Sequence, residues 1–119
     1  MITSKMTEIE LNDGEKINLT LNFSKLLEVR NKRKEVYKRY NEIVMDGVKD
    51  SFDSADVLYT AYLCALDNPE KGMSREAFLE KLPPYPVYIN NIMFELMQPK
   101  KKTDSEELSQ KRPENQNEE

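Results

Sequence analysis

Four aspartates at intervals of three or four residues are the best candidates for acid–base chemistry in this sequence: Asp46, Asp50, Asp53 and Asp56. Carboxylates that converge on a cleft can exchange protons with a substrate or hold Mg²⁺. These four straddle the connection between two predicted helices, where Asp53 and Asp56 suit the N-terminal cap and first turn. We therefore interpret them as capping and solvated residues and predict no catalytic residue. An enzyme that uses Asp50, Asp53 and Asp56 is the least favoured alternative.

The residues that are absent or rare exclude most other catalytic and cofactor chemistry. The chain of 119 residues has no His, so imidazole bases, Ser-His-Asp triads and His metal ligands are excluded. The single cysteine, Cys64, cannot form an intramolecular disulfide or a Cys-rich zinc site. The glycines Gly14, Gly47 and Gly72 are too far apart for a phosphate-binding loop. We predict that the protein is not an enzyme and uses no cofactor and no metal.

The basic segment Arg30–Arg39 is a candidate nucleic-acid contact. Its arginines and lysines could bind phosphates, and Tyr37 and Tyr40 could stack on bases. The same segment also fits a solvated helix face, on which two glutamates lie four residues before basic partners: Glu28 before Lys32, and Glu35 before Arg39. The tyrosines follow the apolar stripe of that helix, and the net charge of −4 argues against a nucleic-acid binder. A small regulator that contacts nucleic acid through Arg30–Arg39 is therefore the alternative interpretation.

Aromatic and sulfur-containing side chains form a third candidate, a protein-binding surface. The third and last predicted helices carry apolar residues on more than one face, among them Tyr59, Leu63, Phe94 and Met97. A small domain cannot bury both faces of such helices by itself, so we expect these residues to contact another protein. Met and aromatic side chains suit a surface that repacks around different partners. The same surface would let the protein form a homo-oligomer when no partner is present.

The elements that position these residues are predicted from the spacing of apolar residues. Residues 8–12 and 16–23 alternate on either side of Asp13-Gly14, which predicts a β-hairpin over about 8–23. After Phe23 the spacing changes to three and four residues, which predicts four to five helices. The fold class is therefore mostly α with an N-terminal β-hairpin.

Local signals predict where the helices begin and end. A basic interruption at residues 31–34 predicts a break between the first two helices, and Gly47 ends the second. Ser24 is expected to cap the first helix, Asp53 or Ser54 the third, and Ser74 the fourth. Pro86 is expected in the first turn of the last helix.

The composition changes at Pro99. Between Pro99 and Glu119 the sole apolar residue is Leu108, so we predict a disordered charged tail over 99–119 and one helical domain over 1–98. The most apolar window, Val57–Leu66, is too short to cross a membrane, and the first residues lack the apolar stretch of a signal peptide. These features predict a cytoplasmic protein without membrane contact.

The order of these elements resembles that of the tail assembly chaperones of long-tailed phages, or prophages, of Gram-positive bacteria. The resemblance covers about residues 8–98 and rests on a hairpin that runs into a helix, followed by the segments Val36–Ile43 and Asp56–Ala65. It implies a non-enzymatic protein of the host cytoplasm that is absent from the mature virion. Its implied role is to coat the tape-measure protein and help bring tail-tube subunits to it.

The resemblance also implies a longer form of the protein, which such phages commonly make by ribosomal frameshifting near the end of the short form. Lys100–Lys102 stands where the predicted domain ends, and three lysines in a row can be encoded by an adenine run on which ribosomes slip. Lysine-rich starts of disordered tails are also common. The basic run Lys32–Lys34 is not part of the pattern that carries the resemblance.

Overall fold

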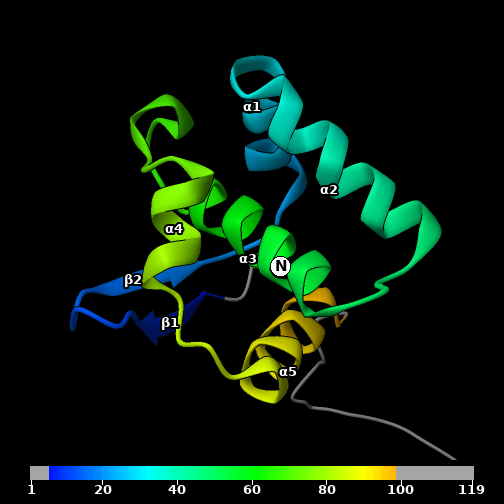
Figure 1. Cartoon of the computed structure of the whole chain (residues 1–119). Helices are drawn as coiled ribbons and strands as arrows, with labels where there is room; N and C mark the ends of the chain where they lie inside the picture. Colours follow the sequence, from blue (N-terminus) through cyan, green and yellow to red (C-terminus); the bar gives the residue numbers. More distant parts are fainter. Residues whose placement is uncertain (1–5, 99–119) are drawn as a thin grey trace, which may run out of the picture.

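The computed structural model describes residues 6–98, as a two-stranded hairpin followed by five α-helices (Figure 1). The elements are β1 (Thr7–Glu10), β2 (Lys16–Leu19), α1 (Phe23–Lys32), α2 (Lys34–Asp46), α3 (Ser51–Cys64), a 3-10 turn η1 (Pro69–Lys71), α4 (Arg75–Lys81) and α5 (Pro86–Met97). The predicted fold class, mostly α with an N-terminal hairpin, is confirmed. The predicted tail, 99–119, lies outside the described residues.

The hairpin forms where the alternating pattern predicts it. The two strands pair antiparallel with Ile9 opposite Ile17, and both side chains are buried. Gly14 in the turn has a φ of +89°, a conformation that residues with a Cβ rarely adopt. The turn also contacts the end of α4, because the backbone N–H of Asn12 donates to the carbonyl of Lys81 at 2.8 Å. The hairpin therefore holds the end of α4 in place.

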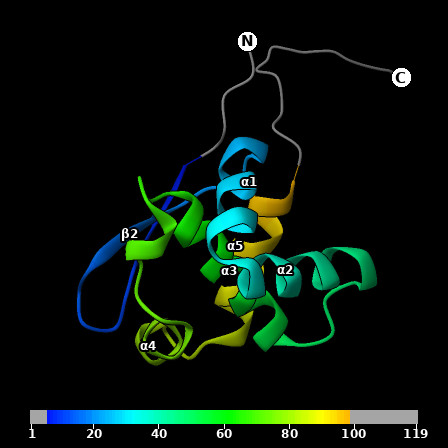
Figure 2. The same cartoon turned by 90° about the horizontal axis from the view of Figure 1, so that it is seen from above.

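A break separates α1 from α2, as predicted. Arg33 lies between the two helices with φ −135° and ψ 67°, outside the helical region. Val36 and Ile43 bury one side of α2, whereas its C-terminal end extends away from the other helices (Figure 2). Gly47 ends α2 with a φ of +93°, as predicted.

Two helix starts differ from the prediction. The residue that caps α1 is Asn22 rather than Ser24, and its side-chain oxygen accepts from a backbone N–H of the first turn at 2.9 Å. The residue that caps α3 is Asp50 rather than Asp53 or Ser54. In both places several residues whose side chains can cap a helix lie close together. Because all of them are favoured at this position, residue type alone does not decide which one caps the helix. The other two signals are confirmed, with Ser74 capping α4 and Pro86 in the first turn of α5.

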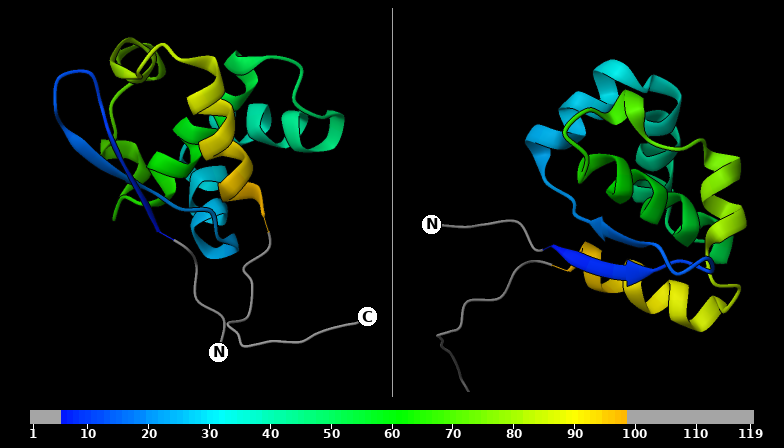
Figure 3. Two further views of the ribbon diagram at one scale, coloured as in Figure 1. Left: turned by 90° about the horizontal axis from the view of Figure 1, so that it is seen from below. Right: turned by 90° about the vertical axis from the view of Figure 1, so that its left-hand side faces the viewer.

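The central helix of the fold is α3, which is buried on all sides after its first two residues. Every residue from Asp53 to Cys64 is buried, and α3 contacts β2, α1, α2, α4 and α5. In Figure 3 (right) it lies between α1 and α2 above and α5 below. A helix that carries apolar residues on every side suits such a position. The expectation that Tyr59 and Leu63 give α3 an exposed apolar face is therefore wrong, although Phe52 in its first turn is exposed.

Candidate functional site

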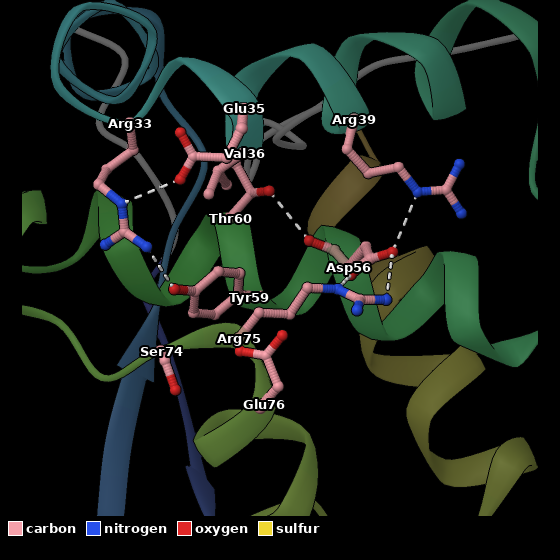
Figure 4. A pocket seen from close by; sticks show the side chains of 10 residues that line it. All are labelled: Arg33, Glu35, Val36, Arg39, Asp56, Tyr59, Thr60, Ser74, Arg75 and Glu76. Carbon is pink, nitrogen blue, oxygen red and sulfur yellow. Dashed lines mark hydrogen bonds and ion pairs between the residues drawn. The ribbon is translucent and has the colours of Figure 1, made fainter.

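A pocket of about 250 Å³ lies between α2, α3 and α4 (Figure 4). Three arginines line it: Arg33 precedes α2, Arg39 lies on α2 and Arg75 begins α4. Asp56 of α3 lies between two of them in Figure 4. The pocket therefore brings the basic segment together with Asp56, one of the four aspartates that the sequence singles out.

Asp56 is buried and binds two guanidinium groups. Arg75 donates from Nε to Oδ1 at 2.6 Å and from Nη2 to Oδ2 at 3.3 Å, and Arg39 donates from Nε to Oδ2 at 3.1 Å. These hydrogen bonds to Asp56 raise the pKa of both arginines. Asp53, one turn earlier, accepts from Arg39 and from the backbone N–H of Lys49. The two aspartates therefore connect α3 to α2 and α4. Asp53 lies in the first turn of α3, as expected, but neither aspartate is solvated, so that part of the interpretation is wrong.

This network leaves the carboxylates with little capacity for acid–base or metal chemistry. The backbone N–H of Lys49 and the Arg39 guanidinium lower the pKa of Asp53, so it stays ionised. Each oxygen of Asp56 already accepts from a guanidinium. Within residues 6–98, no group of three or more acidic or cysteine side chains is placed to hold a metal ion. Burial also raises the pKa of the Cys64 thiol to about 12, which keeps it protonated.

Arg33 is also engaged within the fold. Its Nη2 donates to the hydroxyl oxygen of Tyr59 at 2.9 Å, and its Nη1 donates to the carbonyl of Pro69 at 3.1 Å. The Tyr59 hydroxyl in turn donates to the carbonyl of Met73 at 2.8 Å. Glu35 pairs with Arg33 at 3.4 Å rather than with Arg39, and Glu28 pairs with Lys25 rather than Lys32, so both predicted pairs are wrong.

The segment Arg30–Arg39 therefore presents no continuous cationic stripe. Arg33 and Arg39 hold buried partners, while Tyr37 and Tyr40 pack against the core, as the apolar stripe predicts. The remaining basic side chains are exposed, namely Arg30, Lys32, Lys34 and Lys38.

We expect nucleic-acid binding to be weak. Because two of the six basic side chains of Arg30–Arg39 are engaged in the fold, few remain to contact successive phosphates. Anisotropy of labelled DNA and RNA at about 0.15 M salt should show affinities weaker than about 1 µM. Tighter binding would support the alternative interpretation, a regulator that contacts nucleic acid, if it falls steeply with salt and is lost on charge reversal at Arg30, Lys32 and Lys34.

The Asp53 network should make stability depend on acidic pH. The folded-state pKa of Asp53 lies below the ordinary aspartate value of 3.8, so its ionised form stabilises the folded protein above about pH 4. This contribution is lost as the pH falls through the folded-state pKa. Asp53→Asn should therefore lower the free energy of unfolding at pH 7, and the difference from the native protein should shrink below pH 4. Urea unfolding of both proteins between pH 7 and values below pH 4 measures this difference in the free energy of unfolding. A difference that does not change with pH would contradict the role of the ionised Asp53 side chain.

An apolar groove of about 260 Å³ opens at the N-terminal ends of α3 and α5. Its walls include Phe52 of α3, Leu82 at the end of α4, and Tyr85 and Ile89 at the start of α5. Phe52 and Tyr85 are about two thirds exposed, at 66% and 64%. The volume is below the range of ordinary small-molecule pockets, so the groove suits one or two apolar side chains of a partner.

Three further exposed apolar side chains lie along α5, outside the lining of this groove. Val87, Phe94 and Met97 are separated by seven and three residues, which places them on one side of the helix. Their exposed fractions are 71%, 64% and 39%. In Figure 3 (right), α5 forms the lower edge of the molecule, with no element beyond it among the described residues. We call Phe52, Tyr85, Val87, Phe94 and Met97 the α5 surface.

The structure divides the four predicted partner-binding residues into two pairs. Phe94 and Met97 are exposed and belong to the α5 surface. Tyr59 and Leu63 are buried, at 1% and 0% exposure, so they cannot make a surface contact, and this part of the prediction is wrong. Tyr59 instead packs against Phe78, with ring centroids 5.3 Å apart, because α4 covers this side of α3.

Sequence reasoning missed Phe52 and Val87, and it did not select Tyr85 among the partner-binding residues. Phe52 lies exposed in the first turn of α3, whereas the sequence prediction begins this helix at Asp53 or Ser54 and leaves Phe52 outside it. Tyr85 and Val87 flank Pro86 at the start of α5. The sequence shows more apolar residues there than one core-facing side of a helix can hold, and this excess could have revealed both residues.

Comparisons with known proteins identify no relative. Within residues 6–98, no helix has the length and apolar character needed to cross a membrane. The sequence matches no protein-family model, and neither a curated protein nor a solved structure shows significant similarity to this chain.

Proposed function

We propose that this protein is a tail assembly chaperone of a phage or prophage of Gram-positive bacteria. In this role it uses the α5 surface to bind apolar helical segments of the tape-measure protein and assists tail-tube assembly, without catalysis. The observation that carries the proposal is the α5 surface itself, in which five large apolar side chains remain exposed, two of them lining a groove and three along α5. The order of hairpin and helices agrees with the resemblance on which the proposal also rests.

The chemistry of the α5 surface fits a helical client. Between its apolar residues α5 carries the neutral amides Asn90 and Asn91, and its one charged residue is Glu95. Such a surface contacts the apolar face of an amphipathic helix without burying unpaired charges. Phe and Met side chains also adapt to small changes in partner shape, which a chaperone needs when its client offers many similar faces.

The experiment is co-expression with the tape-measure protein that the proposal expects to be encoded just downstream of this gene. The client should be soluble when the native protein is present and insoluble when it is absent. A client that is equally soluble in both cases would contradict the proposed function.

A further inference from the structure

The outward side of α5 has the same order of apolar and amide side chains in both directions. Val87 and Phe94 are seven residues apart, so they lie two turns apart on one line along the helix. Asn90 and Asn91 stand between them, and both are exposed. The opposite side of the helix packs on the core through Ile89, Ile92, Met93 and the partly buried Leu96. An apolar, amide, apolar sequence of this kind is symmetric about the midpoint between residues 90 and 91.

The two amides have hydrogen-bonding groups that the fold does not use. The Asn90 side-chain oxygen accepts from the Ser54 hydroxyl at 2.7 Å, which leaves both N–H donors of that amide available. The Asn91 side chain makes no hydrogen bond with another residue between 6 and 98. Because an amide is both donor and acceptor, a second copy of the same amide can satisfy it.

The charges of α5 do not oppose a second copy on this side. The helix has no basic residue, and its one charged residue is Glu95. In an antiparallel pair centred between residues 90 and 91, the two Glu95 positions are nine residues apart along the helix axis, or about 14 Å. This separation exceeds the Debye length of about 8 Å at physiological salt. The lack of basic side chains also leaves nothing on α5 to bind the phosphates of a nucleic acid.

The groove at the start of α5 has a matching apolar side chain at the other end of the same helix. Pro84 and Pro86 line the groove, and Met97 lies in the last turn, 39% exposed. Residues 84 and 97 are equally far from the midpoint between 90 and 91. Met97 also follows Pro86 by eleven residues, three turns along the same flank of the helix. An antiparallel copy therefore brings its Met97 to the level of the groove.

We propose that two copies of this chain pair through α5 in antiparallel orientation, about a two-fold axis between residues 90 and 91. Val87 of each copy packs against Phe94 of the other, and the two Asn91 amides hydrogen-bond to each other across the axis. Met97 of each copy covers the groove of the other. Figure 3 (right) shows this side of α5 at the edge of the molecule, with no described element in the way. The pairing itself stands without the proposed function, and only competition between client and second copy for this surface rests on it.

Hydrogen-bond complementarity selects a second copy as the occupant of this side when no client is present. A wholly apolar partner would bury the Asn91 amide without a hydrogen-bond partner, which is unfavourable, whereas a second copy pairs it. A helix of 12 residues is about 18 Å long, so the contact is smaller than a standard protein interface and the dimer should be weak. Because the contacts are apolar or uncharged, its Kd should change little with salt.

Two variants of one exposed residue test the pairing with the full chain. Asn91→Asp places two carboxylates opposite each other across the axis, and Asn91→Lys places two ammonium groups there. Sedimentation equilibrium should give a dimer Kd at least about tenfold weaker for each variant than for the native protein. An equimolar mixture of the two should form a heterodimer at least as tight as the native dimer, since opposite charges then meet. Circular dichroism checks that both variants are folded.

The control is Asn41→Asp, which makes the same change at an exposed asparagine of α2 and should leave the dimer unchanged. The pairing is overturned if the native protein is monomeric up to ~1 mM, if Asn91→Asp dimerises as tightly as the native protein, or if the mixture associates no better than its components.

Co-expression with the client separates this inference from the proposed function. Asn91→Asp keeps Phe94 and Met97, so it should solubilise the client as well as the native protein does. Rescue of the client by a native protein that is monomeric would overturn the pairing alone. A client that stays insoluble beside a native dimer would contradict the proposed function alone.

Discussion

Replacing Phe94 and Met97 together by aspartate will abolish the solubilisation of the tape-measure protein while leaving the fold intact. Both side chains are exposed, so the variant loses little core packing. Central apolar contacts typically contribute about 2 kcal/mol each to binding, so losing two should weaken the affinity by about 10³-fold. Co-expression followed by sedimentation of the insoluble client measures the result.

The matched control for this double variant is Phe23→Asp. Phe23 is 87% exposed at the start of α1, outside the α5 surface, and an aspartate there suits the first turn of the helix. The control should rescue the client as well as the native protein does. Full rescue by the double variant would show that the client binds elsewhere.

Replacing Leu63 by alanine will destabilise the protein by about 2–5 kcal/mol, the usual cost of truncating a fully buried leucine. Leu63 has no exposed surface and lies against the backbone of Gly72, where its Cδ2 would be 2.5 Å from a Cβ built on that glycine. Urea unfolding measures the loss, with Phe94→Ala as an exposed control that should change stability by less than about 0.5 kcal/mol. A loss below about 1 kcal/mol for Leu63→Ala would contradict its place in the core.

The contrast between Leu63 and Phe94 shows what apolar periodicity can and cannot predict. The hairpin and the helix break near Arg33 follow from local signals, and both are confirmed. The excess of apolar residues on α3 and α5 is equally visible in the sequence. Periodicity does not say whether the second face is covered by the same chain or by a partner. On α3 the chain itself covers it, and on α5 Phe94 remains exposed.

The arginine network illustrates a second limit. Local reasoning pairs Arg39 with Glu35, which lies four residues away on the same helix. In the fold Arg39 points toward α3 and binds Asp56, 17 residues away in sequence. No spacing rule connects these two residues, because the angle at which α2 crosses α3 decides their contact. Predicting the pair requires the packing of α2, α3 and α4 and not only their boundaries.

The measurement that tests the central claim most directly is photo-crosslinking from single positions of the full chain to the co-expressed tape-measure protein. Benzoylphenylalanine would replace Phe94 or Met97 on the α5 surface, and Glu80 on α4 as an exposed control. We predict crosslinks to the client from positions 94 and 97 and none from position 80. Crosslinks from position 80 with none from 94 or 97 would contradict the α5 surface as the client-binding site.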